Sequence, residues 1–159
     1  MYIIDTITGE HIPAAVSKID LKEIALINKS KRFDFNWNAE KLNDVYKLAA
    51  EGISEPLGLM SLVDRPEDFA TEIRLIAVSK DNKGKERRYD RIAGSMIAFA
   101  CKESFAAGYN GFICLKPKTL IKDHYREKYN LQSTKLFLVS EGSNSLDLIK
   151  AYYQDGKEK

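Results

Sequence analysis

The chain has 159 residues, 44% of them hydrophobic and 30% charged, and its formal net charge is only +2. These values are ordinary for one soluble globular domain, here residues 1–159, and so small a charge gives no reason to expect a nucleic-acid partner. The N-terminus lacks the pattern of a signal peptide, and no apolar run approaches the ~20 residues that cross a membrane. We therefore expect a cytoplasmic protein.

The first part of the chain predicts two extended stretches and then short helices. Residues 2–18 contain the two stretches, joined around Gly9, which supplies the positive φ that a tight turn needs. Residues 21–43 combine short helical pieces with the irregular stretch FDFNWN, and Asp20 is placed to cap the first helix.

Three predicted strands follow, separated by the turn-forming clusters EGISEP and DRPED, at residues 45–50, 57–63 and 69–78. Such short connections favour an antiparallel meander, because parallel pairing needs a long crossover. The unpaired edge of this meander would suit a homodimer.

The second half of the chain alternates between helices and strands. We predict a buried helix over 92–107, a strand over 112–115, an amphipathic segment over 120–129, a strand over 135–139 and a terminal helix capped by Ser143 or Asn144. The complete order predicts an α/β (α+β) protein. Its sheet would be mixed and mostly antiparallel, with helices on both faces and a central β-α-β crossover.

The two cysteines, Cys101 and Cys114, both lie in apolar stretches. Neither belongs to a CxxC or Cys/His pattern with the spacing of zinc ligands. We expect buried thiols in a reducing compartment, and we predict no metal site.

The loop between the third strand and the long helix suggests a ligand. Residues 79–91 carry six basic side chains against three acidic ones, and the first amides of the helix that follows lack intrahelical partners. Gly94 would let a ligand approach the backbone closely, and Ser95 would add a hydroxyl. This combination predicts a site for a phosphorylated ligand, although a solvated surface loop also explains most of the lysines.

The stretch EIRLIAV, the basic loop, RIAGSM, the apolar helix, GFICL and HYREKYNL together resemble the core of the GNAT acetyltransferases. The resemblance covers about residues 44–131. In that family a strand precedes a pyrophosphate loop of the form Arg/Gln-x-x-Gly-x-Gly/Ala, and the run from Arg91 to Gly94 matches its first four positions. Met96 departs from the small residue expected at the end, and the loop before Arg91 is longer than usual.

The resemblance implies that acetyl-CoA is the acyl donor. Backbone groups of Ile76, Ala77 and Val78 would bind its pantetheine arm, which pairs like an added strand. The pyrophosphate would be held by the residues that start the helix, namely Arg91, Ile92, Ala93, Gly94 and Ser95.

The resemblance also implies two catalytic residues. Tyr125 would protonate the departing thiolate, and Glu72 would deprotonate the incoming ammonium through water. Each residue also has a structural interpretation: Glu72 shares a strand face with Arg74 and would form a plain ion pair, and Tyr125 would be a core residue of an amphipathic helix.

The sequence therefore predicts an N-acetyltransferase that transfers an acetyl group from acetyl-CoA to a primary amine by direct attack. The acceptor would be a small molecule or a protein lysine. The resemblance implies that residues 27–43 line its site, and Lys29, Lys31 and Arg32 in this segment hint at a carboxylate or phosphate on the acceptor. The alternative is a non-catalytic acyl-CoA sensor or interaction protein with the same fold.

Overall fold

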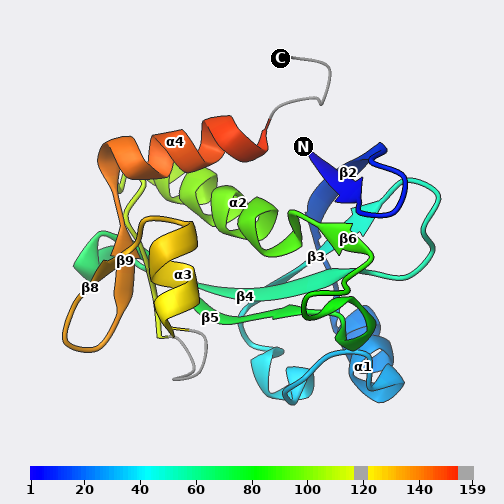
Figure 1. The fold of residues 1–159 in the computed structure, drawn as a ribbon. Helices are drawn as coiled ribbons and strands as arrows, with labels where there is room; N and C mark the ends of the chain where they lie inside the picture. Colours follow the sequence, from blue (N-terminus) through cyan, green and yellow to red (C-terminus); the bar gives the residue numbers. More distant parts are fainter. Residues whose placement is uncertain (117–121, 154–159) are drawn as a thin grey trace.

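The computed structural model describes residues 1–116 and 122–153, whose strands form one mixed sheet (Figure 1). The strands are β1 (Tyr2–Asp5), β2 (His11–Lys18), β3 (Asp44–Ala50), β4 (Gly58–Arg65), β5 (Ala70–Val78), β6 (Tyr89–Asp90), β7 (Ile113–Leu115), β8 (Gln132–Ser133) and β9 (Leu138–Ser140). Their order in the sheet is β6-β1-β2-β3-β4-β5-β7-β9-β8. The neighbouring strands pair antiparallel except β5 and β7, which are parallel, so the predicted mostly antiparallel sheet with a central crossover is confirmed.

Helices cover both faces of the sheet, as predicted (Figure 1). One face carries α2 (Ile92–Ala106), α3 (Lys122–Lys128) and α4 (Gly142–Tyr152), whose apolar side chains share a core with the sheet. The other face carries α1 (Leu21–Ser30) and the short helix η1 (Trp37–Glu40), which form a second core around Trp37. Two further short helices, η2 (Pro66–Asp68) and η3 (Lys80–Asn82), lie at the two ends of β5.

Local sequence signals explain where α1 begins but not where α4 begins. The Asp20 carboxylate accepts a hydrogen bond from the Glu23 amide, which is the predicted cap of α1. The prediction that Ser143 or Asn144 caps α4 was wrong, because the helix already begins at Gly142, after Glu141. The Asn144 side chain instead donates hydrogen bonds to the Tyr129 carbonyl and the Ser140 hydroxyl. Its amide is therefore used in tertiary contacts and not in capping the helix.

Two expectations about strands need correction. The outer edge of the predicted meander is not free, because β3 pairs with β2 over five residues from Ala14↔Ala50 to Lys18↔Tyr46. The strand predicted over 135–139 lies later, at β9, and pairs with the short strand β8. Leu120 and Ile121 of the predicted amphipathic segment, and residues 154–159, lie outside the described residues.

Residues 1–116 and 122–153 show neither a membrane-spanning helix nor a cluster of metal ligands. No helix there has the length and apolar character needed to cross a membrane, and no three His, Cys, Asp or Glu side chains group as metal ligands would. The thiols of Cys101 and Cys114 are buried, and this burial raises the pKa of each to about 11.

The N-terminal hairpin holds the end of the basic loop, an arrangement that the sequence did not predict. Residues 89–90 form β6 and pair with Ile4 and Asp5 of β1. The Arg88 guanidinium donates to both oxygens of the buried Asp5 carboxylate, at 3.0 and 2.8 Å, and lowers the pKa of that carboxyl to about 2. The loop is therefore fixed at its end rather than solvated along its length.

We predict that Asp5→Asn lowers the thermal unfolding midpoint at neutral pH by several degrees, because Arg88 loses a bidentate charged partner. The folded-state pKa of Asp5 lies below its ordinary value of 3.8, so the pair stabilises the protein above that pH and its contribution disappears as the pH falls toward about 2. Unfolding midpoints of wild type and variant, measured between neutral pH and pH 2, should therefore converge in acid. A difference that does not shrink between neutral pH and pH 2 would contradict the assignment.

Candidate functional site

The parallel strands β5 and β7 pair over only three residues, from Thr71↔Ile113 to Ile73↔Leu115. β5 continues to Val78 while it remains paired with β4 on its other side. At Arg74 the β4–β5 register shifts, so that Leu62 faces Ile73 and Ser61 faces Leu75. Such a bulge bends a strand and increases its twist. Beyond Ile73, within the described residues, the side of β5 that faced β7 has no strand partner.

A cavity of about 600 Å³ opens beside this unpaired edge. β5, the basic loop, the start of α2, and α3 all contribute to its walls. The predicted site residues that line it are Ile76, Ala77, Val78, Arg91, Ile92, Ala93 and Tyr125. Glu72, Gly94 and Ser95 are not among its lining residues, so the structure brings most of the predicted site together and separates these three from it.

Two tyrosines of the α3 region form an aromatic wall of the cavity. Tyr125 and Tyr129 are both buried, and their rings meet edge to face with centroids 5.6 Å apart. Burial raises the pKa of both phenols. Tyr125 is thus a core residue and a cavity residue at once. Tyr129 was missed, although its spacing of four residues from Tyr125 places both on one helix face.

The first turn of α2 meets the cavity at Ile92 and Ala93. The residue before them, Arg91, has a left-handed backbone with φ of 80°, and its side chain does not cap the helix. The Arg91 amide donates to the Asp90 carboxylate at 2.9 Å, and the first intrahelical bond joins the Ser95 amide to the Arg91 carbonyl. The amides of Ile92, Ala93 and Gly94 consequently have no acceptor within the helix and are its open N-terminal donors among the described residues.

The side chain of Arg91 is engaged away from the helix start. Its guanidinium lies 4.1 Å from the ring centroid of Tyr2 and 4.7 Å from that of Tyr152, and it donates to the carbonyls of Tyr2 and Ala151. Arg91 therefore joins the N-terminal strand to the C-terminal helix. The predicted role of its charge beside a pyrophosphate is not supported by these contacts.

Gly94 and Ser95 also differ from what we predicted. A Cβ atom at Gly94 would come within 2.1 Å of the Tyr152 ring, so this glycine admits a side chain of the protein rather than a ligand. The Ser95 hydroxyl is buried and has no hydrogen-bond partner among the described residues. Both side-chain positions face the packing between α2 and its neighbours.

The backbone geometry supports a different alignment of the family pattern. In Arg/Gln-x-x-Gly-x-Gly/Ala, the first glycine suits a left-handed residue, and here that conformation belongs to Arg91. The pattern then runs from Arg88 to Ala93, with Arg88 at its first position and Ala93 as its small last residue. The apparent departure at Met96 disappears, and the remaining departure is Arg91 itself.

Most charges of the basic loop are paired within the protein. Asp34, from the segment after α1, pairs with Lys80 and Lys83, and the hydrogen bond from Lys83 lowers the pKa of its carboxyl. Arg87 pairs with Asp90 at 3.1 Å. Lys85 and Lys128 also line the cavity, so its mouth remains positively charged overall.

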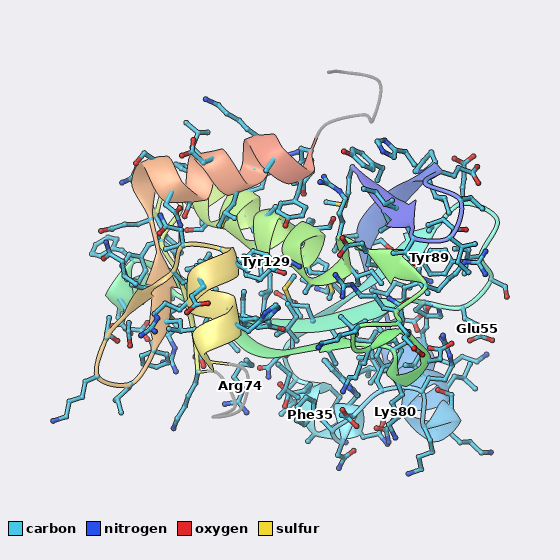
Figure 2. All side chains as sticks on the ribbon, viewed as in Figure 1. Phe35, Glu55, Arg74, Lys80, Tyr89 and Tyr129 are labelled. Carbon is cyan, nitrogen blue, oxygen red and sulfur yellow. The ribbon has the colours of Figure 1, made fainter. Side chains whose placement is uncertain are left out.

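Glu72 lies on the sheet face opposite α2 rather than in the cavity. Its carboxylate accepts a hydrogen bond from the Arg65 Nε at 2.6 Å. The predicted ion pair with Arg74 was wrong, because Arg74 faces Glu40 of η1. Figure 2 shows Arg74 and Phe35 on the α1 side of the sheet and Tyr129 on the α2 side.

The expected acceptor segment, residues 27–43, contributes only Asp34 and Phe35 to the cavity lining. Arg32 donates to the Pro56 carbonyl at 2.7 Å and pairs with Glu55 and Asp81. The predicted hint that Arg32 recognises an anionic acceptor is therefore not supported.

We predict that Gly94→Ala lowers the free energy of unfolding by about 1–3 kcal/mol, because the new methyl group overlaps the Tyr152 ring. Chemical denaturation would measure the change. In a Tyr152→Ala background the same substitution should cost much less, since the overlapping ring is gone. An equal cost in both backgrounds would show that the ring does not set the need for glycine.

No protein-family model and no curated protein matches the sequence. Solved structures are similar in fold at low sequence identity. yncA of Salmonella typhimurium, solved with its cofactor acetyl-CoA, is 11% identical, with a TM-score of 0.51 over 80% of this chain and 93% of that chain. AtaT complexed with acetyl-methionyl-tRNAfMet is also 11% identical, with a TM-score of 0.51 over 87% of this chain and 99% of that one. A cAMP-binding acyltransferase from Mycobacterium smegmatis is 12% identical, with a TM-score of 0.53 over 96% of this chain and 55% of its own length. The protein therefore has the fold of the GNAT acetyltransferases.

Proposed function

We propose that the protein is an N-acyltransferase that uses acetyl-CoA to acetylate a primary amine by direct attack. The observation that carries the proposal is the cavity, where an unpaired strand edge, an open helix start and a buried phenol come together. Its volume of about 600 Å³ lies within the range of small-molecule sites. Acetyl-CoA would supply an activated thioester.

The strand edge and the helix start would bind the two chemically different parts of the donor. Amides and carbonyls of Ile76, Ala77 and Val78 would pair with the amide-containing pantetheine arm, as an added strand does. The amides of Ile92 and Ala93 would donate to the pyrophosphate, which the helix dipole also favours. Lys85 and Lys128 would add positive charge at the mouth.

Tyr125 would serve as the general acid for the departing thiolate. Burial raises the pKa of its phenol, so the proton stays on the oxygen at neutral pH and is available when negative charge develops on the sulfur. Glu72 would act on the incoming ammonium through water, from the opposite face of the sheet. Arg65 holds the Glu72 carboxylate, so Glu72 would not contact the cavity directly.

The alternative is a non-catalytic acyl-CoA sensor or interaction protein. The position of Glu72, outside the cavity and in a short ion pair, favours it, because the sensor would keep the donor site without an acceptor base. Both proposals require donor binding, and only the first requires turnover.

Donor binding is tested by calorimetric titration of acetyl-CoA into wild type and Ala93→Asp. Aspartate in the first turn suits the helix, so the variant should fold, but its charge would repel the pyrophosphate and weaken binding at least tenfold. The matched control is Ala107→Asp, the same change at the exposed far end of α2. If the wild type does not bind acetyl-CoA, both the acetyltransferase and the sensor proposals are wrong.

Turnover is tested with Tyr125→Phe, which keeps the aromatic wall and removes the proton. We expect kcat to fall by about 10²–10⁴, while the dissociation constant of acetyl-CoA stays within about twofold. Single-turnover assays with an amine panel and calorimetry would measure the two quantities. Unchanged kcat would remove Tyr125 from the mechanism, and a wild type that binds without any turnover would favour the sensor.

A further inference from the structure

We propose that Tyr152, on α4, is a positioning residue for the phosphorylated part of the acyl donor. Its ring, together with that of Tyr2, holds Arg91 in the backbone conformation from which α2 begins. The inference rests on the proposed function, because Arg91 directly precedes Ile92 and Ala93, whose amides are assigned to the donor's pyrophosphate. Tyr152 itself does not line the cavity and so acts through its neighbours.

The backbone of Arg91 is the feature that needs support. Its φ of 80° and ψ of 12° lie in the left-handed region, which is unfavourable for a residue with a Cβ atom and costs glycine almost nothing. Ile92 and Ala93 follow directly and line the cavity. A change of the Arg91 backbone to a more common conformation would reorient the first turn of α2 relative to the loop before it. The donor site therefore depends on contacts that keep Arg91 left-handed.

The Arg91 side chain makes such contacts with elements at both ends of the described chain. Its guanidinium carbon lies 4.1 Å from the ring centroid of Tyr2 and 4.7 Å from that of Tyr152. Its Nε donates to the Tyr2 carbonyl at 3.2 Å, and its Nη2 donates to the Ala151 carbonyl at 2.8 Å. β1 and the end of α4 thus meet at the start of α2 (Figure 1). Cation–π contacts strengthen as the ring is shielded from water, and Tyr2 is only 8% exposed, so they can offset the cost of the left-handed backbone.

Tyr152 also contacts the second part of the donor site. A Cβ atom at Gly94 would come within 2.1 Å of the Tyr152 ring, so this ring lies directly against the first turn of α2. Its centroid is 6.5 Å from that of Tyr129, whose ring in turn meets Tyr125. One side chain outside the cavity therefore contacts both the helix start and the aromatic wall.

A double-mutant cycle tests the proposal. Coenzyme A is titrated calorimetrically into wild type, Tyr152→Leu, Arg91→Gly and the double variant, where leucine retains apolar bulk and removes the ring. We expect Tyr152→Leu to raise the dissociation constant about tenfold when Arg91 is present, and by no more than about twofold in the Arg91→Gly background. Glycine adopts the left-handed backbone without help from a side chain, so the ring is no longer required there.

Further variants separate positioning from general destabilisation. Tyr152→Phe keeps the ring and removes the hydroxyl, so its affinity should stay within about twofold of wild type. Tyr153→Leu changes the residue that follows α4, whose ring centroid lies 4.5 Å from Lys102 Nζ, and should also bind as wild type does. Thermal unfolding shows whether each variant is folded. If Tyr152→Leu is not, Tyr2→Leu removes the other ring and should show the same dependence on Arg91.

The possible failures are distinguishable. An equal loss of affinity in both backgrounds would give Tyr152 a structural role unrelated to Arg91 and would overturn the proposal. Wild-type affinity in Tyr152→Leu, or an equally large loss in Tyr153→Leu, would overturn it as well. A wild type that does not bind coenzyme A contradicts the proposed function itself, and this inference with it.

Discussion

The site depends on one constraint of the sheet: within the described residues, β5 extends beyond the last pair that it forms with its parallel partner β7. Pairing ends at Ile73↔Leu115, and the bulge at Arg74 turns the rest of β5 away. Backbone N–H and C=O groups need partners, so an edge left open inside a protein is a binding surface for another extended chain. The cavity, the aromatic wall and the start of α2 all gather around this edge.

Elements far apart in the sequence hold the rest of the site in position. The basic loop closes on itself through hydrogen bonds between the Asn82 side chain and the Tyr89 backbone, and then joins the N-terminal hairpin through Arg88 and Asp5. Arg91 keeps an unfavourable left-handed backbone that glycine would adopt more easily. Its guanidinium compensates by stacking between Tyr2 and Tyr152. The strain and the compensation lie at the same residue, immediately before the amides that face the cavity.

Most of the fold could be predicted because its signals are local. Turn clusters separate the strands of the meander, and apolar composition marks α2. The errors came from features set by distant partners. β6 exists because Arg88 and Asp5, 83 positions apart, meet in the fold. The sequence shows a glycine at position 94 but cannot show that the Tyr152 ring occupies the space beside it. Similarly, no local pattern predicts the left-handed backbone of Arg91 or the β-bulge at Arg74. For the same reason, the sequence did not predict that Arg65 is the ion-pair partner of Glu72.

The contacts of Arg91 have a consequence for the order in which the protein matures. The Ala151 carbonyl, which accepts a hydrogen bond from Arg91, is synthesised 60 residues later. During translation the sheet strands through β7 emerge before α4 does, so the start of α2 lacks its stacking partner Tyr152 until nearly the whole described chain has left the ribosome. The nascent protein would thus complete the contacts around the start of α2 only after α4 has emerged.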